Sequence, residues 1–220
     1  MDSRIRIIEQ IKSDGLLPLY FYPDAAKSFE ILKALYDGGI RVIEYTNRGK
    51  QALQNFEFMK KQANQFPDLL LGAGTIKDAS SANQFIQAGA DFLISPGIPE
   101  DVFDVTYENK VLWIPGCMTV TEIIKAENFG LSFVKIFPGN LLGPSFIQSI
   151  KDIFPDFSFM PTGGVEPEEK NLKAWFDAGV SAVGMGSKMV TNKMMEQGHY
   201  KKITAAAKET LRIISDVRRK

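Results

Sequence analysis

The sequence predicts a single (β/α)8 TIM barrel with an N-terminal helix, a fold of the α/β class. Short apolar or β-branched runs alternate with longer amphipathic stretches along the 220-residue chain, as expected for repeated βα units. The expected strands begin 19 to 27 residues apart, and no linker or block of like charge separates the units. We therefore expect one domain over residues 1–220, with the N-terminal helix at about 3–13, the barrel at about 16–190 and a C-terminal helix at about 199–216.

Eight runs have the length and the apolar or β-branched composition of buried parallel strands. Eight such strands, each followed by a helix, are the number that closes a barrel of this kind. An open, doubly wound sheet is the alternative, but no G-x-G-x-x-G fingerprint follows the first strand. The expected strands are residues 16–20, 42–45, 69–71, 92–94, 111–114, 133–136, 157–160 and 182–184.

Helical periodicity follows several of these strands, with apolar residues three and four positions apart. Several of the helical stretches are followed by a glycine, such as Gly39, Gly89 and Gly179, which can adopt the left-handed conformation that caps a helix. The expected helices are residues 25–36, 80–88, 120–128, 144–153 and 168–178.

The composition is that of an average globular protein, and it argues against several function classes. Hydrophobic residues make up 45% of the chain and charged residues 24%, and 26 basic residues balance 26 acidic ones. Zero net charge argues against binding nucleic acid or a membrane surface through bulk electrostatics. The single cysteine, Cys117, allows no intrachain disulfide, and the N-terminal residues lack an apolar secretory signal. We therefore expect a cytoplasmic protein without nucleic-acid or membrane partners.

The single histidine, His199, limits the chemistry further. One histidine cannot build a multi-histidine zinc site, so a zinc site of that kind is excluded. A Ser-His-Asp triad would have to use this residue, which lies in a polar segment near the C-terminus. An enzyme with this composition must take its nucleophile, acid and base mainly from other side chains or from a bound cofactor.

Lys135 is the most informative charged residue, because it interrupts the apolar run FVKIF at 133–137. Strand alternation puts it on the same face as the two phenylalanines of that run. Desolvation favours the neutral form of an amine, which can then attack a ketone and form a Schiff base. A lysine at this position can also reach water or pair with a buried carboxylate, so Lys135 alone does not establish this chemistry.

Glu44 is a carboxylate at the end of the apolar strand at 42–45. A partly buried glutamate near an amine can accept and donate protons. The alternative is a structural salt bridge with Arg41 or Arg48. Arg48 itself has a planar fork that suits a substrate carboxylate, if it does not simply lie at the surface.

Glycine-rich turns follow the last two expected strands. Gly163 and Gly164 follow the seventh strand, and Gly186 and Ser187 follow the eighth. Barrels of this class often bind phosphate at these two positions through backbone N–H groups and a helix N-terminus. A glycine pair alone is usually only a turn, but its occurrence at both strands favours a phosphate site, to which Lys188 could add charge.

Six short motifs, in order and with similar spacing, resemble those of the 2-keto-3-deoxy-6-phosphogluconate (KDPG) aldolase and 4-hydroxy-2-oxoglutarate aldolase family. The resemblance extends over about residues 16–187. The motifs are GGIRVIEYTNR at 38–48, GAGT at 72–75, ISPG at 94–97, PG at 115–116, VKIFP at 134–138 and PTGG at 161–164.

The resemblance implies a class I aldolase that uses a covalent lysine–substrate Schiff base, needs no metal or other cofactor, and forms a homotrimer. In this family pattern Lys135 looks like the Schiff-base lysine and Glu44 like the general acid and base. The remaining residues implied by the resemblance bind substrate. Arg48, Gly74, Thr75 and Thr162 would hold the carboxylate, Pro96 and Phe137 would form an apolar wall, and Gly163, Gly164, Gly186 and Ser187 would bind the phosphate.

Three places depart from the family pattern. They are the run LYFY at 19–22, Asn47, and the pair Gly139-Asn140. We expect these residues to shape the pocket and to affect the choice of 2-keto acid rather than to perform the chemistry.

The resemblance implies cleavage of KDPG to pyruvate and glyceraldehyde 3-phosphate, with 4-hydroxy-2-oxoglutarate as a second substrate. Two alternatives remain. A sugar-phosphate isomerase or epimerase would use Glu44 as base and form no covalent adduct. A non-catalytic sugar-phosphate-binding protein would bind phosphorylated ligands without turnover.

Overall fold

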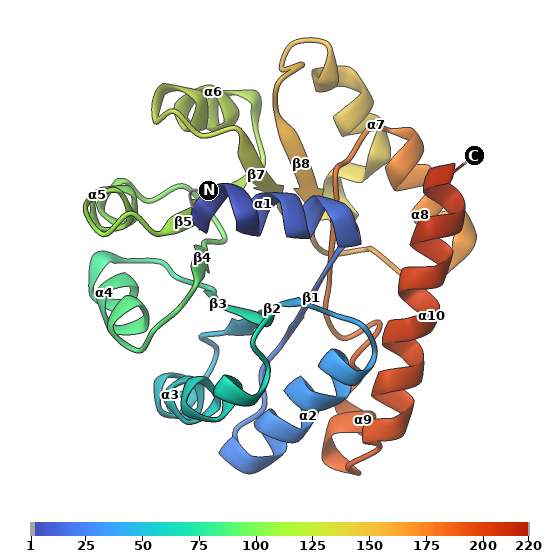
Figure 1. Ribbon diagram of the computed structural model, residues 1–220. Helices are drawn as coiled ribbons and strands as arrows, with labels where there is room; N and C mark the ends of the chain where they lie inside the picture. Colours follow the sequence, from blue (N-terminus) through green and yellow to red (C-terminus); the bar gives the residue numbers. More distant parts are fainter. Residues whose placement is uncertain (1–2, 220) are drawn as a thin grey trace.

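The computed structural model describes residues 3–219, in which helices lie around the outside of a ring of parallel strands (Figure 1). Helix α1 (Ser3–Asp14) lies across one end of this ring. The strands are β1 (Leu16–Tyr20), β2 (Val42–Thr46), β3 (Leu70–Gly74), β4 (Phe92–Ile94), β5 (Leu112–Ile114), β6 (Gly116–Cys117), β7 (Phe133–Ile136), β8 (Ser158–Pro161) and β9 (Val183–Met185).

Helices connect the successive strands and close the outer layer. Helix α10, at the C-terminal end, packs against α2 and α8 and is three residues longer at its end than the expected 199–216. The helices after α1 are α2 (Ala25–Asp37), α3 (Ala52–Gln62), α4 (Ala79–Gln87), α5 (Glu100–Glu108), α6 (Val120–Asn128), α7 (Gly139–Lys151), α8 (Glu169–Asp177), α9 (Asn192–Glu196) and α10 (Tyr200–Arg219), with a 3-10 turn at Ala63–Gln65.

The prediction of a closed eight-stranded barrel is wrong. The strands form two separate sheets, a curled six-stranded sheet in the order β5-β4-β3-β2-β1-β9 and a three-stranded sheet in the order β6-β7-β8. All the pairs in both sheets are parallel. The order of strands along the chain follows the expected alternation, but the hydrogen-bonded ladder does not run continuously around the ring.

Proline accounts for both interruptions, because it has no N–H to donate to a ladder. Pro115 directly follows the expected fifth strand, residues 111–114, and separates β5, which pairs with β4, from β6, which pairs with β7. Pro161 ends β8, and beyond it only an isolated bridge between Thr162 and Gly184 links this strand to β9. The two sheets therefore meet along two incomplete seams.

Local capping signals explain where several helices begin and end. Thr119 and Glu122 form a reciprocal capping box at the start of α6, and the Asp24 side chain accepts a hydrogen bond from Lys27 N–H at the start of α2. Helix α7 starts at Gly139, before the expected residue 144, but Gly143 has a non-helical φ of 69° that separates a first turn from the main segment. The sequence pattern detected only the second part.

Strand alternation separates two apolar clusters. The interior cluster, on the strand faces turned toward one another, contains side chains from α1, from six strands and from Ala182, which directly precedes β9. The intervening residues, such as Ile43, Tyr45, Val134 and Ile136, belong to the core between the strands and the outer helices. The interior cluster consists of Ile7, Ile11, Leu17, Val42, Phe92, Ile94, Leu112, Ile114, Phe133, Met160 and Ala182.

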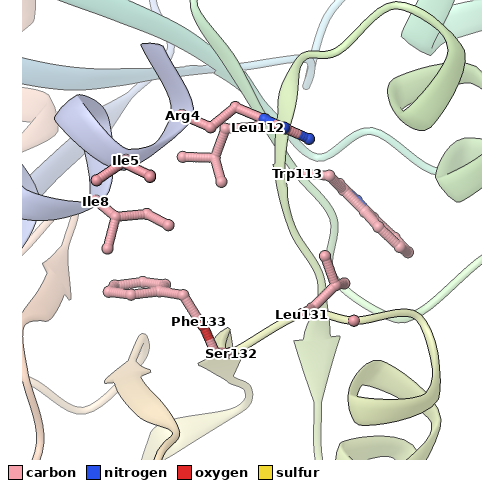
Figure 2. A pocket seen from close by; sticks show the side chains of 9 residues that line it. Arg4, Ile5, Ile8, Leu112, Trp113, Leu131, Ser132 and Phe133 are labelled. Carbon is pink, nitrogen blue, oxygen red and sulfur yellow. The ribbon is translucent and has the colours of Figure 1, made fainter. Parts of the chain in front are cut away.

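A cavity of about 290 Å³ lies between α1 and the N-terminal ends of β5 and β7. Figure 2 shows Ile5 and Ile8 of α1 on one side of it and Trp113 and Leu131 on the other. The cavity therefore lies at the opposite end of the strands from the motifs that carry the expected chemistry. No helix within residues 3–219 is long and apolar enough to cross a membrane.

Candidate active site

Glu44 lies inside the ring, where strand alternation on β2 places it. Val42, two residues earlier, belongs to the interior cluster, and the exposed fraction of Glu44 is 1%. Its neighbour across the ladder is Gly72 of β3, and a Cβ built on Gly74 would overlap its carboxylate. The absence of a side chain at Gly74 therefore creates the space that the carboxylate occupies.

Neither carboxylate oxygen of Glu44 accepts a hydrogen bond from any residue in the described range. The predicted alternative of a salt bridge with Arg41 is not seen, because Arg41 pairs with Asp68 at 2.7 Å. A buried carboxylate without partners is costly to the folded state, so its position calls for a functional explanation. It is available to exchange protons with a substrate.

Lys135 enters the same interior from the other sheet. Residue Phe133 of the same strand belongs to the interior cluster, which puts Lys135 on the inward face, and its exposed fraction is 4%. Its Nζ atom lies 5.2 Å from the centroid of the Phe137 ring. Within residues 3–219 its ammonium makes no ion pair. This amine is therefore not held by a structural carboxylate.

Thr162 has a buried side-chain oxygen without a hydrogen-bond partner, as Glu44 does. Its Oγ1 atom accepts and donates no hydrogen bond among the described residues, and a Cβ built on Gly184 would overlap it. Thr162 directly follows Pro161, at the seam where its backbone bridges to Gly184. The hydroxyl thus occupies space left by a glycine, as the Glu44 carboxylate does.

Thr75 has a strained backbone at the end of β3. Its φ is 62°, in the left-handed region that β-branched residues rarely adopt, at a cost of about 1–3 kcal/mol. The preceding carbonyl, of Gly74, accepts a hydrogen bond of 2.8 Å from Asn47 N–H. Strain of this kind is concentrated at binding sites, which agrees with a substrate-contacting role for Thr75.

Pro96 and Phe137, the expected apolar wall, are half-buried at the ends of β4 and β7. The Pro96 carbonyl lies so close to Gly116 that a Cβ there would overlap it. The seam glycine Gly116 therefore lets the loop after β4 approach β6.

The expected phosphate loops lie at the same end of the strands. Gly163 and Gly164 have φ values of 93° and 72°, which glycine adopts without strain. The first residue of α7 contacts this turn, because Gly139 N–H donates to Thr162 O at 2.8 Å and Asn140 packs against Gly164.

A cavity of about 230 Å³ brings Arg48 together with Gly186 and Ser187. The expected carboxylate set is thus spread over several strand ends, with Arg48 closest to the expected phosphate residues. The other lining residues come from β1, the segment after it and the region of α9. They are Leu19, Tyr20, Phe21, Val190, Asn192 and Met195.

The residues after β1, which depart from the family pattern, are held by a polar network. Asn55 donates to the carbonyls of Tyr22 and Pro23 at 3.0 and 3.1 Å, and the Tyr45 hydroxyl donates to Tyr22 O at 2.7 Å. Phe21 packs against Gly49, where a Cβ would overlap its ring. This network fixes one wall of the Arg48 cavity.

Sequence reasoning missed three residues that build the site. Thr46 is fully buried two positions after Glu44, and Gly116 and Gly184 provide space at the two seams. Counting in steps of two from Glu44 would have identified Thr46. The two glycines could not have been recognised without knowing which side chains lie opposite them.

Metal-ligating residues are not clustered in the described part of the chain, where no group of three or more His, Cys, Asp or Glu residues could hold a metal ion. The arrangement instead combines a buried amine, a buried carboxylate, strained and glycine-rich loops, and an arginine. Such a set can form and break an imine while binding an anionic substrate.

Comparisons with known proteins agree with this chemistry. Residues 7–206 match the family model described as KDPG and KHG aldolase. The 2-dehydro-3-deoxy-phosphogluconate aldolase of Pseudoalteromonas atlantica is 32% identical over 205 residues, covering 92% of this chain and 93% of that protein. The KHG/KDPG aldolase of Escherichia coli is 32% identical over 206 residues, covering 92% and 94%.

A solved structure extends the likeness to the fold. The KDPG aldolase of Legionella pneumophila, captured with pyruvate as a covalent carbinolamine intermediate, superposes with a TM-score of 0.84. It is 27% identical, and the match covers 91% of this chain and 96% of that chain. With the family model matching most of its length, the chain belongs to the KDPG and KHG aldolase family.

Proposed function

We propose that Lys135 and Glu44 are the catalytic pair with which this aldolase cleaves KDPG to pyruvate and glyceraldehyde 3-phosphate. The observation that carries the assignment is a buried amine without an ion pair on one sheet and a buried carboxylate without hydrogen bonds on the other. The enzyme is a Schiff-base aldolase, a carbon–carbon lyase, and 4-hydroxy-2-oxoglutarate is its second substrate.

The reaction begins when the neutral Lys135 amine adds to the C2 carbonyl and forms a carbinolamine. Loss of water gives a protonated imine. Glu44 then removes the proton of the C4 hydroxyl, the C3–C4 bond breaks, and its electron pair moves into the imine to form an enamine. After the aldehyde leaves, Glu44 returns a proton to C3, and water hydrolyses the imine to release pyruvate and the free amine.

We propose for the other residues the binding roles that the family resemblance implies. Thr75, Thr162 and the Gly74 N–H hold the carboxylate of the substrate, together with Arg48. The Arg48 cavity also contains Ser187, so the guanidinium stabilises negative charge near the phosphate end as well. Pro96 and Phe137 contact the carbon chain, and the phosphate is bound by backbone N–H groups of Gly163, Gly164, Gly186 and Ser187.

The imine serves as the electron sink, so the proposed mechanism needs neither a metal nor another cofactor. We also propose a homotrimer in the cytoplasm, as is typical of the family. Exposed apolar side chains before and along α6 and at the start of α7, namely Met118, Val120, Ile124 and Leu141, are available for subunit contacts. Light scattering coupled to size exclusion would test the assembly.

Borohydride trapping tests the catalytic assignment. Incubation with pyruvate and borohydride should attach one reduced pyruvyl group to Lys135, as read by peptide mass spectrometry, and Lys135→Met should abolish both the adduct and pyruvate release. Lys151→Met is a matched control, because Lys151 donates to Phe157 O on the outer layer. A wild-type enzyme that releases pyruvate but never gives an adduct on Lys135, or a Lys135→Met variant that keeps full activity, would overturn the assignment.

A further inference from the structure

One ion pair connects the two glycine-bearing loops among the residues that the structure describes. Lys188, directly after Ser187, pairs through Nζ with Oε1 of Glu166, two residues after Gly164. Both loops are held by backbone hydrogen bonds. Glu166 N–H donates to Asn171 Oδ1 at 3.0 Å, and the N–H groups of Met189 and Val190 donate to Gly186 O at 3.0 Å each.

The ion pair between Lys188 and Glu166 is too exposed to hold the two loops together strongly. The side chains of Lys188 and Glu166 are 58% and 35% exposed, and solvent-exposed ion pairs contribute about 0–1 kcal/mol to stability. Hydrogen bonding and charge attraction from Glu166 raise the pKa of the Lys188 amine, so it stays charged at neutral pH. Lys188 is therefore a cation that can change partner at little energetic cost.

A bound phosphate would compete with Glu166 for the ammonium of Lys188. A phosphate monoester carries about −1.5 to −2 charge at pH 7, more than a carboxylate, and offers three acceptor oxygens. The same anion would repel Glu166. Arg48 and Ser187 line the same cavity, and Lys188 directly follows Ser187, so a Lys188 ammonium that turned toward this cavity would add a second cation beside the phosphate.

We propose that Lys188 is a phosphate-binding residue that Glu166 holds beside the loops until substrate arrives, and that the exchange makes the enzyme favour phosphorylated substrates. This inference rests on the proposed function, since it concerns the same substrate's phosphate. Glu166 acts as a positioning residue that competes with the phosphate for Lys188.

The test compares kcat/KM for KDPG with that for its unphosphorylated analogue, 2-keto-3-deoxygluconate. Lys188→Met should lower the ratio of the two values about fivefold, mainly through a higher KM for KDPG. Glu166→Gln should raise the ratio about twofold, because Lys188 loses its competing partner. Lys173→Met is the matched control, since its exposed ion pair with Asp177 lies within α8.

The two proposals fail in different ways. If Lys188→Met changes both substrates equally, or if Glu166→Gln lowers the ratio as Lys188→Met does, the ion pair is only a structural tie and this inference is overturned. If the wild-type enzyme cleaves neither substrate, the proposed function fails instead. Titration with inorganic phosphate then decides the role of Lys188, because unchanged phosphate binding in Lys188→Met would overturn it independently.

Discussion

The two ends of the ring interior are built from inward-facing residues of the same strands, but the residues at the two ends differ in chemical type. At the end covered by α1, inward-facing residues such as Ile11, Val42 and Phe133 pack into an apolar cluster. One pleat further along the same strands stand Glu44 and Lys135, buried to a similar extent. Alternation thus decides only which residues face inward, and the position along the strand decides whether they serve packing or chemistry.

The difference also appears in how the polar groups are satisfied. Glu44 and Thr162 bury oxygens that have no hydrogen-bond partner in the described chain, as does Oδ2 of Asp14 at the end of α1, whereas the side chains of the interior cluster contain no nitrogen or oxygen. Buried groups without partners destabilise a fold. We therefore expect the unpaired polar groups at the end opposite α1 to lower the free energy of unfolding. Apolar substitutions of these groups should raise that free energy, whereas truncations at the end covered by α1 should lower it.

Replacing Glu44 should give the largest effect on activity. Glu44→Gln keeps the shape but removes the proton acceptor, so we expect kcat to fall by about a thousandfold. Borohydride should still attach pyruvate to Lys135, because the amine is intact. The control Glu57→Gln changes an exposed carboxylate on α3. A kcat within threefold of wild type would remove Glu44 from the mechanism.

Truncation at the covered end should affect stability instead. Ile11 is fully buried, and Ile11→Ala should lower the free energy of unfolding by about 3 kcal/mol through lost burial and a new cavity. Urea unfolding followed by circular dichroism measures this change, while kcat per folded molecule should stay the same. Ile5→Ala, at an exposed position of the same helix, should cost less than about 1 kcal/mol.

Thr162→Val should separate stability from binding. Replacing the unpaired hydroxyl with a methyl group should raise the free energy of unfolding by about 1 kcal/mol, because the buried polar atom is removed. The same change should raise KM for KDPG. A loss of stability would show that the hydroxyl has a partner in the folded protein, and the comparison between the two ends would then fail for this residue.

Treatment of the native protein with an alkylating reagent should give the smallest effect, because the thiol of Cys117 is buried. Burial, the main cause, raises the pKa of its thiol to about 12, so almost none is thiolate at pH 8. Because thiolate is the reactive form, iodoacetamide should leave the native protein unmodified at this pH, as judged by intact mass. Rapid alkylation before unfolding would contradict the burial of β6. Urea-unfolded protein serves as the positive control.

Much of the strand order could be predicted from composition, because buried parallel strands are short apolar runs that stand out between amphipathic helices. Strands at Leu16–Tyr20, Phe92–Ile94 and Phe133–Ile136 agree with expectation to the residue. Closure of the barrel could not be predicted, since it depends on whether single N–H groups find partners. Pro115 and Pro161 lie in or beside apolar runs that otherwise read as uninterrupted strands.

The candidate site could be located only in part. A charged residue within an apolar strand, such as Lys135 or Glu44, can be identified from the sequence alone. The space around such a residue cannot be predicted in this way. Gly74 and Gly184 leave room for the side chains of Glu44 and Thr162, which lie on neighbouring strands. The ion pair between Lys188 and Glu166 could not be predicted from the sequence either, since side-chain direction in loops depends on tertiary contacts.

The cover formed by α1 has a consequence for the order of events during turnover. Ile7 and Ile11 of α1 pack beneath the strands and fill this end of the interior, so we expect substrate to enter by the opposite end, where Glu44 and Lys135 lie. In the proposed mechanism pyruvate stays bonded to Lys135 after the C3–C4 bond breaks, and the aldehyde is the fragment that is free to leave. The aldehyde must therefore leave first, and in the synthetic direction pyruvate must bind first.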